Sequence, residues 1–77
     1  MKKADMKSEA RFWIELKIAN IKEALDVETS RDKMLDVGTI VRFATHCGLI
    51  TDEEKKEYLM QADEAQIDRE IELTNVA

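Results

Sequence analysis

The chain has 77 residues, of which 38% are charged and 44% are hydrophobic, and its net charge at pH 7 is −5. A chain of this length forms at most one domain, and it buries too little surface to be very stable without a disulfide, a metal or a partner. With one cysteine and one histidine, it can form neither an internal disulfide nor the usual four-ligand zinc site. Oligomerisation and close helix packing remain as sources of stability.

The composition also bears on location. No segment approaches the ~20 consecutive apolar residues that span a bilayer, and the first residues, 1–9, are charged where a signal peptide is apolar. We therefore expect a cytoplasmic protein with no membrane partner, and the unpaired cysteine fits a reducing compartment.

The pattern of residues predicts an all-α fold, because the chain has no proline, two glycines and few β-branched or aromatic clusters. We expect one domain over residues 1–77 with helices at 6–27, 31–47 and 52–73. The last two helices should form an antiparallel hairpin, which packs with the long first helix.

The first predicted helix carries two apolar strips. One strip has helical spacing and is expected to face the core; its members are Ala10, Ile14, Ile18, Ile21 and Leu25. The other strip lies nearly opposite and contains Phe12, Leu16 and Ala19. Trp13 lies beside this strip, and tryptophan is enriched at binding hot spots. We therefore predict an interface at Phe12, Trp13 and Leu16.

The break between the first two helices is weakly marked, since residues 26–32 contain no glycine or proline. Thr29 with Asp32, or Ser30 alone, could cap the second helix. The alternative is one long bent helix.

The second predicted helix places an apolar side toward the core, formed by Val37, Ile40, Val41, Ala44 and Cys47. Gly38 interrupts this pattern at a cost of roughly 1 kcal/mol relative to alanine. We interpret it as a site of close helix packing or as a tolerated weak position.

The joint between the second and third helices is strongly marked. Gly48 can adopt the left-handed conformation of a Schellman ending, with Leu49 packing back onto Ala44. Thr51 and Glu54 have the spacing of a capping box. The sequence therefore predicts that one helix ends at Gly48 and the next begins after Thr51.

The third predicted helix also divides its apolar residues into two sets. The core set is Tyr58, Leu59, Ala62, Ala65 and Leu73, and a separate strip contains Met60, Ile67 and Ile71. The spacing of this strip resembles a short coiled-coil seam with Glu64 inside it. We predict a homodimer that buries the surplus strips of the first and third helices.

Beside this strip runs a column of acidic residues at helical spacing: Glu53, Glu57, Glu64, Asp68 and Glu72. Such a column could bind a basic partner, or it could be a solvated face that keeps the protein soluble.

A helix, a turn with glycine and a second helix also suggest a helix-turn-helix unit. The recognition helix of that unit would begin Asp52-Glu53-Glu54, which would repel phosphates, so nucleic acid is a disfavoured partner.

Catalysis has little support in the sequence. His46 and Cys47 are neighbours on a helix and diverge by about 100°, so they do not form a nucleophile and base pair. We interpret Cys47 as a small core residue. No phosphate-binding loop or metal motif is present in the sequence, and we expect no enzyme activity, no cofactor and no metal.

Together these features predict a small protein-protein interaction module of the bacterial or phage type, acting as a regulator, inhibitor or adaptor. A nucleic-acid-associated regulator is the first alternative, and an accessory subunit of an enzyme is the second.

Overall fold

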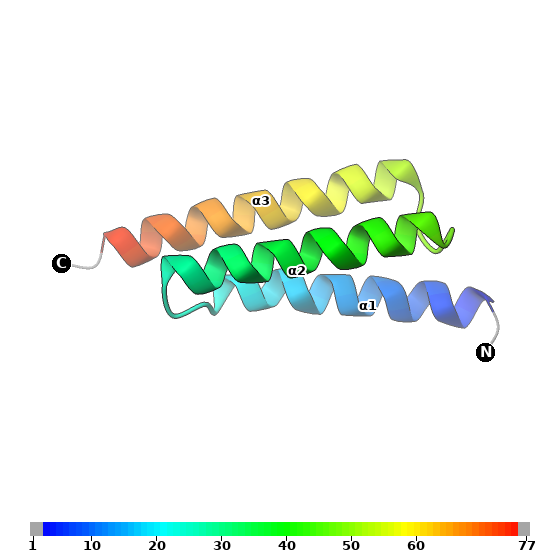
Figure 1. Ribbon diagram of the computed structural model, residues 1–77, viewed down its shortest axis with the longest axis horizontal. Coiled ribbons are helices and arrows are strands. Elements are labelled where there is room, and N and C mark those ends of the chain that lie inside the picture. The colour runs from blue at the N-terminus through cyan, green and yellow to red at the C-terminus, as the bar shows by residue number, and fades with distance from the viewer. Residues whose placement is uncertain (1–2, 76–77) are drawn as a thin grey trace.

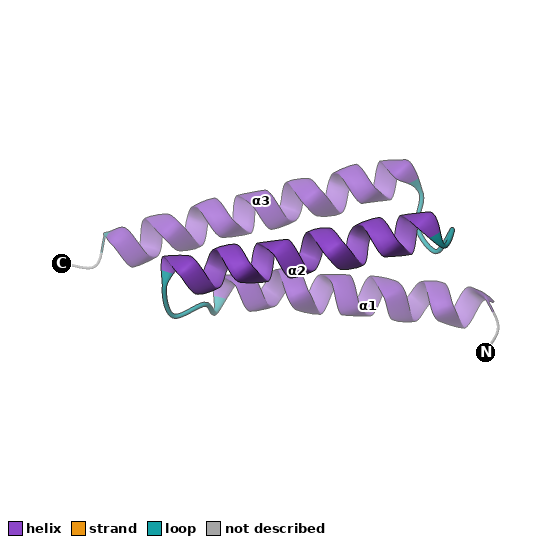
Figure 2. Ribbon diagram, in the orientation of Figure 1, coloured by secondary structure: helices purple, strands orange, loops and turns teal. Residues whose placement is uncertain are grey.

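The computed structural model describes residues 3–75 as three helices: α1 (Lys3–Lys22), α2 (Val27–His46) and α3 (Asp52–Thr74) (Figure 1). The predicted domain, residues 1–77, extends beyond this range at both ends. Within the described range, helices and short loops make up the whole chain, without strands (Figure 2). The predicted all-α fold is confirmed.

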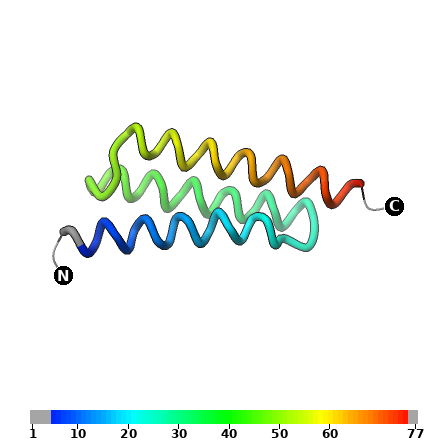
Figure 3. Tube along the Cα trace, turned by 180° about the vertical axis from the view of Figure 1, so that it is seen from behind, coloured from blue at the N-terminus to red at the C-terminus, as the bar shows by residue number. Residues whose placement is uncertain are grey.

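The helices form an elongated bundle of 50 × 21 × 14 Å in which each helix packs against the other two. The chain reverses direction at each loop, so that α1 and α3 run roughly parallel to each other and antiparallel to α2 (Figures 1 and 3). The predicted antiparallel hairpin is therefore the pair α2 and α3.

The core lies along the axis of this bundle, where one face of each helix is buried. Its main side chains are Ile14, Ile18 and Ile21 from α1, Val37, Val41 and Ala44 from α2, and Tyr58, Ala62 and Ala65 from α3. These belong to the faces that the helical spacing predicts. Ile50, between α2 and α3, also belongs to the core.

The junction between α1 and α2 differs from the prediction. The helix α1 ends at Lys22, five residues before the expected end, and α2 begins at Val27. The N-cap is Asp26, not Thr29 or Ser30: Asp26 has an extended backbone (φ −152°, ψ 170°), and its carboxylate accepts a hydrogen bond from the Thr29 amide. This extended residue interrupts the helix, so the alternative of one long bent helix is wrong.

The early end of α1 changes which of two neighbouring side chains is buried. Leu25, expected in the core, is 86% exposed, whereas Ala24 is buried. Because these residues are no longer helical, the helical spacing that placed Leu25 on the core face does not apply to them.

Ser30 is buried inside α2, and its hydroxyl donates to the Val27 carbonyl oxygen at 2.8 Å.

The junction between α2 and α3 matches the prediction. Gly48 has a positive φ of 72°, the Leu49 amide donates to the Ala44 carbonyl oxygen at 2.9 Å, and the Gly48 amide donates to the Thr45 carbonyl oxygen at 3.1 Å. These are the two bonds of a Schellman motif. Thr51 and Glu54 then form both hydrogen bonds of the capping box.

The structure corrects the interpretation of Cys47 and distinguishes between the two interpretations of Gly38. Cys47 is exposed, because it is the C-cap residue, where the chain leaves the packed face of the helix. Gly38 is buried but does not mark a close helix contact, since the nearest atom to an added Cβ would be Nη1 of Arg42, at an ordinary 3.9 Å. The interpretation of Gly38 as a tolerated weak position agrees with this geometry.

The surface of the bundle carries many large apolar side chains. Among the described residues no helix is apolar enough, over sufficient length, to cross a bilayer. In the part of the chain that the structure describes, ten large hydrophobic residues are nevertheless exposed, and they include Phe12, Trp13 and Phe43. Most of the others lie on the outer faces of α1 and α3.

Candidate functional site

The outer face of α3 presents the first apolar surface. Met60, Ile67 and Ile71 are 50–56% exposed, and their positions in the helix are turned away from the buried Tyr58, Ala62 and Ala65. We call these three residues the α3 strip. The strip that the sequence analysis identified is therefore exposed to solvent in the single chain.

The acidic column borders this strip on one side. Four of its carboxylates form no ion pair within the described residues, and we call them the acidic flank: Glu53, Glu57, Glu64 and Asp68. The fifth predicted member, Glu72, is paired with Arg69 at 2.9 Å. The predicted acidic surface thus separates into four carboxylates without a cation partner among residues 3–75 and one with such a partner.

The acidic flank also borders the groove between α1 and α3. Two shallow hollows of about 240 and 260 Å³ lie along this groove. Glu57 lines the first hollow together with Glu15 and Glu54, while Glu64 and Asp68 line the second, beside Lys22. Carboxylates from α1 and α3 therefore converge on one side of the bundle.

Two groups at the first hollow have shifted pKa values. The backbone amide of Thr51 and the guanidinium of Arg11, whose Nη2 lies 2.9 Å from Glu54 Oε2, hold the pKa of Glu54 below its usual value. Burial raises the pKa of the Tyr58 hydroxyl, and the charges of Glu15 and Glu54 raise it further. Both residues therefore keep their ordinary neutral-pH forms: Glu54 is ionised and Tyr58 is neutral.

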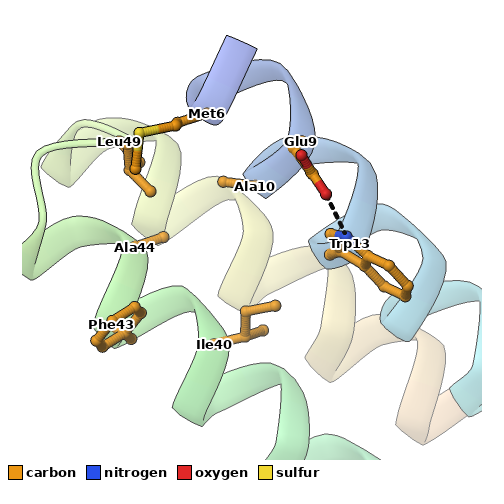
Figure 4. Close-up of a pocket in the computed structure, with 8 residues that line it drawn as sticks. All are labelled: Met6, Glu9, Ala10, Trp13, Ile40, Phe43, Ala44 and Leu49. Atoms are coloured by element: carbon orange, nitrogen blue, oxygen red, sulfur yellow. Dashed lines mark hydrogen bonds between the residues drawn. The ribbon is translucent and has the colours of Figure 1, made fainter. Parts of the chain in front are cut away.

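The groove between α1 and α2 is the second apolar surface (Figure 4). We call it the α1/α2 groove; it encloses about 260 Å³ and is lined by Met6, Glu9, Ala10, Trp13, Ile40, Phe43, Ala44 and Leu49. Glu9 is the one charged residue in this lining, and its carboxylate accepts a weak hydrogen bond from Trp13 Nε1 at 3.5 Å. Such a hollow can hold apolar side chains of another molecule.

Exposed aromatic rings gather around this groove. Trp13 is 44% exposed, and Phe43 on α2 is 65% exposed. Phe12 packs edge-on against Trp13, with 5.6 Å between ring centroids. Phe12 and Leu16 continue this apolar surface onto the outer face of α1.

The predicted interface residues therefore form two surfaces on different helices. Phe12, Trp13 and Leu16 belong to α1, whereas the α3 strip is on α3. Helical spacing did not reveal that Phe43, Ile40 and Leu49 contribute to the α1/α2 groove. Phe43 could be recognised as a marginal residue of the α2 core face, but its position across the groove from Trp13 depends on how α1 and α2 pack (Figure 4).

The arrangement of α2 and α3 bears on the helix-turn-helix alternative. The two helices of such a unit cross at about 90–120°, whereas α3 folds back and runs alongside α2 (Figures 1 and 3). The turn at Gly48 thus has the residues of a helix-turn-helix joint without its crossing geometry.

The residues considered for catalysis or metal binding are not brought together. His46 and Cys47 are both exposed at the end of α2. Within residues 3–75, no group of three histidine, cysteine or acidic side chains has a geometry that could hold a metal ion. Comparisons of the chain with protein-family models, with curated proteins and with solved structures give no match.

Proposed function

We propose that this chain is a cytoplasmic, non-catalytic protein-protein interaction module whose α3 outer face binds a basic amphipathic helix of another protein. One observation carries this proposal: the exposed α3 strip lies beside four carboxylates that have no cation partner among the described residues. A regulator, inhibitor or adaptor of that partner would act by covering its helix.

The α3 strip has the dimensions of a helix-docking surface. Met60, Ile67 and Ile71 are spaced seven and four residues apart, so they lie along one line of about 16 Å on the helix. Apolar side chains at positions i, i+4 and i+7 of a partner helix match this kind of line. Burial of the exposed apolar area would contribute about 25 cal/mol per Å².

The charges beside the strip indicate the charge of the partner helix and the orientation in which it would bind. The acidic flank lies on the side of the strip that faces α1, whereas the side that faces α2 has both Lys56 and Asp63. A partner helix with lysine or arginine along one edge would therefore align that edge with the acidic flank. Complementary charges of this kind raise the association rate and select the orientation.

The same charges oppose the use of this strip by a second copy of the chain. In a parallel pair of α3 helices, Glu64 in the middle of the strip would face Glu64 of the other copy, and like charges at such positions are destabilising. A basic partner removes this repulsion. We therefore assign the α3 strip to a partner of different sequence.

A synthetic helix tests the proposed surface. The probe is a 15-residue amphipathic peptide with leucine at i, i+4 and i+7 and lysine along one edge, added to the ¹⁵N-labelled chain. We expect amide shifts to change along the outer face of α3, and the I67D/I71D variant to weaken binding at least tenfold. A peptide with glutamate in place of lysine should bind much more weakly.

A matched pair of charge variants separates specific docking from general attraction. E64K/D68K changes two carboxylates of the acidic flank, and D32K/D36K makes the same change in net charge on the exposed side of α2. The first variant should weaken binding of the lysine peptide strongly, while the second should have a small effect. Equal effects, or shifts that map away from α3, would show that the proposal is wrong.

A crosslinking experiment in cells of the source organism connects this surface to a natural partner. A photoreactive residue at position 60 should crosslink a specific protein, and the same residue at position 35, on the outer face of α2, should not. The crosslinked protein should contain a basic amphipathic helix that binds the purified chain. Binding that survives I67D/I71D would contradict the assignment.

A further inference from the structure

We infer that the α1/α2 groove is the surface at which two copies of this chain associate, with their α1 helices antiparallel and Trp13 close to the two-fold axis. This inference concerns a different surface from the one proposed for the partner helix. It depends on the exposed area, the aromatic residues and the charges of α1.

The exposed area of the chain is larger than that expected for its mass. The chain exposes 5444 Å², about 600 Å² more than the roughly 4,800 Å² expected for a compact monomer of 8.9 kDa. A standard interface buries about 800 Å² on each partner. The α1/α2 groove and the exposed rings of Phe12, Trp13 and Phe43 would form the apolar centre of such an interface.

The residues in this region are those that dominate protein interfaces. Trp13, Phe43 and Phe12 are all more than 40% exposed, and buried tryptophan and other aromatic anchors supply much of the binding energy at interfaces. In an antiparallel arrangement about Trp13, the two Trp13 rings and the two Phe43 rings would meet near the centre of the interface. Phe12 and Leu16 would lie at its edge.

The low charge of the groove favours a second copy as its occupant. Two identical chains with a net charge of −5 repel each other, so they can associate most easily through a face with few carboxylates. Glu9 is the one acidic residue that lines the α1/α2 groove, whereas several acidic residues line the groove between α1 and α3. Within the described part of this lining, the single carboxylate of Glu9 is too little to select a basic partner.

The two charges on this side of α1 select the antiparallel orientation. Glu9 and Lys17 are each four residues from Trp13, and residues four apart lie on the same side of a helix. In an antiparallel pair centred on Trp13, Glu9 of each copy faces Lys17 of the other. In a parallel pair each Glu9 would face the other Glu9. Lys17 forms no ion pair in the range 3–75, so it is available for this contact.

Sedimentation equilibrium of the full chain tests the inference. We expect a monomer-dimer equilibrium with a dissociation constant below 100 µM. W13A and F43E should each weaken association at least tenfold while the far-UV circular dichroism stays helical, since both side chains are exposed. I67D/I71D, which changes the α3 strip, should leave the dissociation constant unchanged.

A charge exchange tests the orientation. E9K and K17E should each weaken association by about fivefold to tenfold, because each single change converts two symmetric attractions into repulsions. The double variant E9K/K17E restores both pairs with reversed sign, and its dissociation constant should return to within threefold of the wild-type value. Failure of this recovery would overturn the antiparallel arrangement.

Two other results would overturn the assignment of the groove itself. One is a chain that stays monomeric at 500 µM. The other is a dimer that survives W13A and F43E but dissociates in I67D/I71D. The first result does not bear on binding of the lysine peptide to α3, so the two proposals can fail separately. The second result would also contradict the assignment of the α3 strip to a partner of different sequence.

Discussion

The side chain of Arg69, on α3, donates a hydrogen bond from Nε to the carbonyl oxygen of Ala24 at 2.7 Å. Ala24 follows the end of α1 and is almost completely buried. A second nitrogen of the same guanidinium, Nη1, is 2.9 Å from Glu72 Oε2, which orients the group. The C-terminal end of α1 has no glycine cap, and Arg69 thus supplies a hydrogen-bond donor for a carbonyl group just after that end.

Replacement of Arg69 by methionine should therefore destabilise the fold. We expect the free energy of unfolding to fall by about 1–3 kcal/mol, because the Ala24 carbonyl would lose a charge-assisted hydrogen bond in a buried position. The measurement is the urea midpoint at neutral pH.

R31M is the matched control for this change. The Arg31 side chain is 66% exposed and pairs with Glu70 at 3.0 Å, and exposed ion pairs contribute less than about 1 kcal/mol. If both variants lose the same stability, the hydrogen bond to Ala24 is not the cause.

The two glycines should respond to alanine in opposite directions. G38A should raise the free energy of unfolding by about 0.5–1 kcal/mol, because Gly38 lies inside a helix and its added Cβ meets no atom closer than 3.9 Å. G48A should lower it by about 1 kcal/mol or more, because a residue with φ of 72° favours glycine. Thermal denaturation of both variants beside the wild type measures this contrast, and a loss of stability in G38A would show that the position is more tightly packed than the geometry indicates.

Acid should weaken the starts of α2 and α3. The Thr29 amide, which donates to Asp26 at 2.7 Å, holds the pKa of Asp26 below its usual value, and the Thr51 amide with Arg11 does the same for the pKa of Glu54. A carboxyl whose pKa is lower in the folded state stabilises the fold above its unfolded pKa, near 4 for these groups. That contribution is lost as the pH falls through the lower, folded pKa.

The test is chemical denaturation between pH 2 and pH 6. The D26N/E54Q variant keeps hydrogen-bond acceptors at both caps but cannot titrate there, so its stability should fall less steeply than that of the wild type below pH 4.5. D32N/E53Q, which changes two exposed carboxylates that accept no capping hydrogen bond among the described residues, is the control. A wild-type profile in D26N/E54Q would contradict the role of these caps.

Tyr58 should titrate above pH 10 in the folded chain. Burial raises the pKa of its hydroxyl, and the carboxylates of Glu15 and Glu54 oppose formation of the phenolate. Because Tyr58 is the only tyrosine, the phenolate absorbance at 295 nm reports it directly. The midpoint should shift toward 10 in urea, and E15Q should lower it in the folded state.

The same shift predicts a loss of stability in alkali. The folded pKa is raised, so stability is fully present below the unfolded pKa of about 10 and decreases as the pH rises through the folded pKa. Y58F should remove this part of the alkaline decrease. A titration midpoint at 10 in the native wild type would show that the hydroxyl is solvated.

Local sequence signals correctly predicted the ends of helices where particular residues determine the backbone conformation. Gly48 predicted the end of α2, and Thr51 with Glu54 predicted the start of α3, because these signals involve contacts between residues a few positions apart. The start of α2 was predicted incorrectly because Asp26, Thr29 and Ser30 are all acceptable capping residues. Only the structure distinguishes them, through the extended backbone at Asp26 and the burial of Ser30.

The candidate surfaces show the same difference between what the local sequence predicts and what tertiary packing decides. Helical spacing by itself separated Met60, Ile67 and Ile71 from the core set of α3, because the direction of a side chain around a helix follows from its position. Spacing also identified Phe12, Leu16 and Ala19 as a second apolar strip of α1, with Trp13 beside it. Tertiary packing decided that Phe43 and Trp13 line one groove. It also decided that no other helix supplies an ion-pair partner to Glu53, Glu57, Glu64 or Asp68 among the described residues, whereas the pair of Arg69 and Glu72 is a local contact within α3. These relationships join residues on different helices or depend on side-chain geometry, and the periodicity of a single helix contains no information about its neighbours.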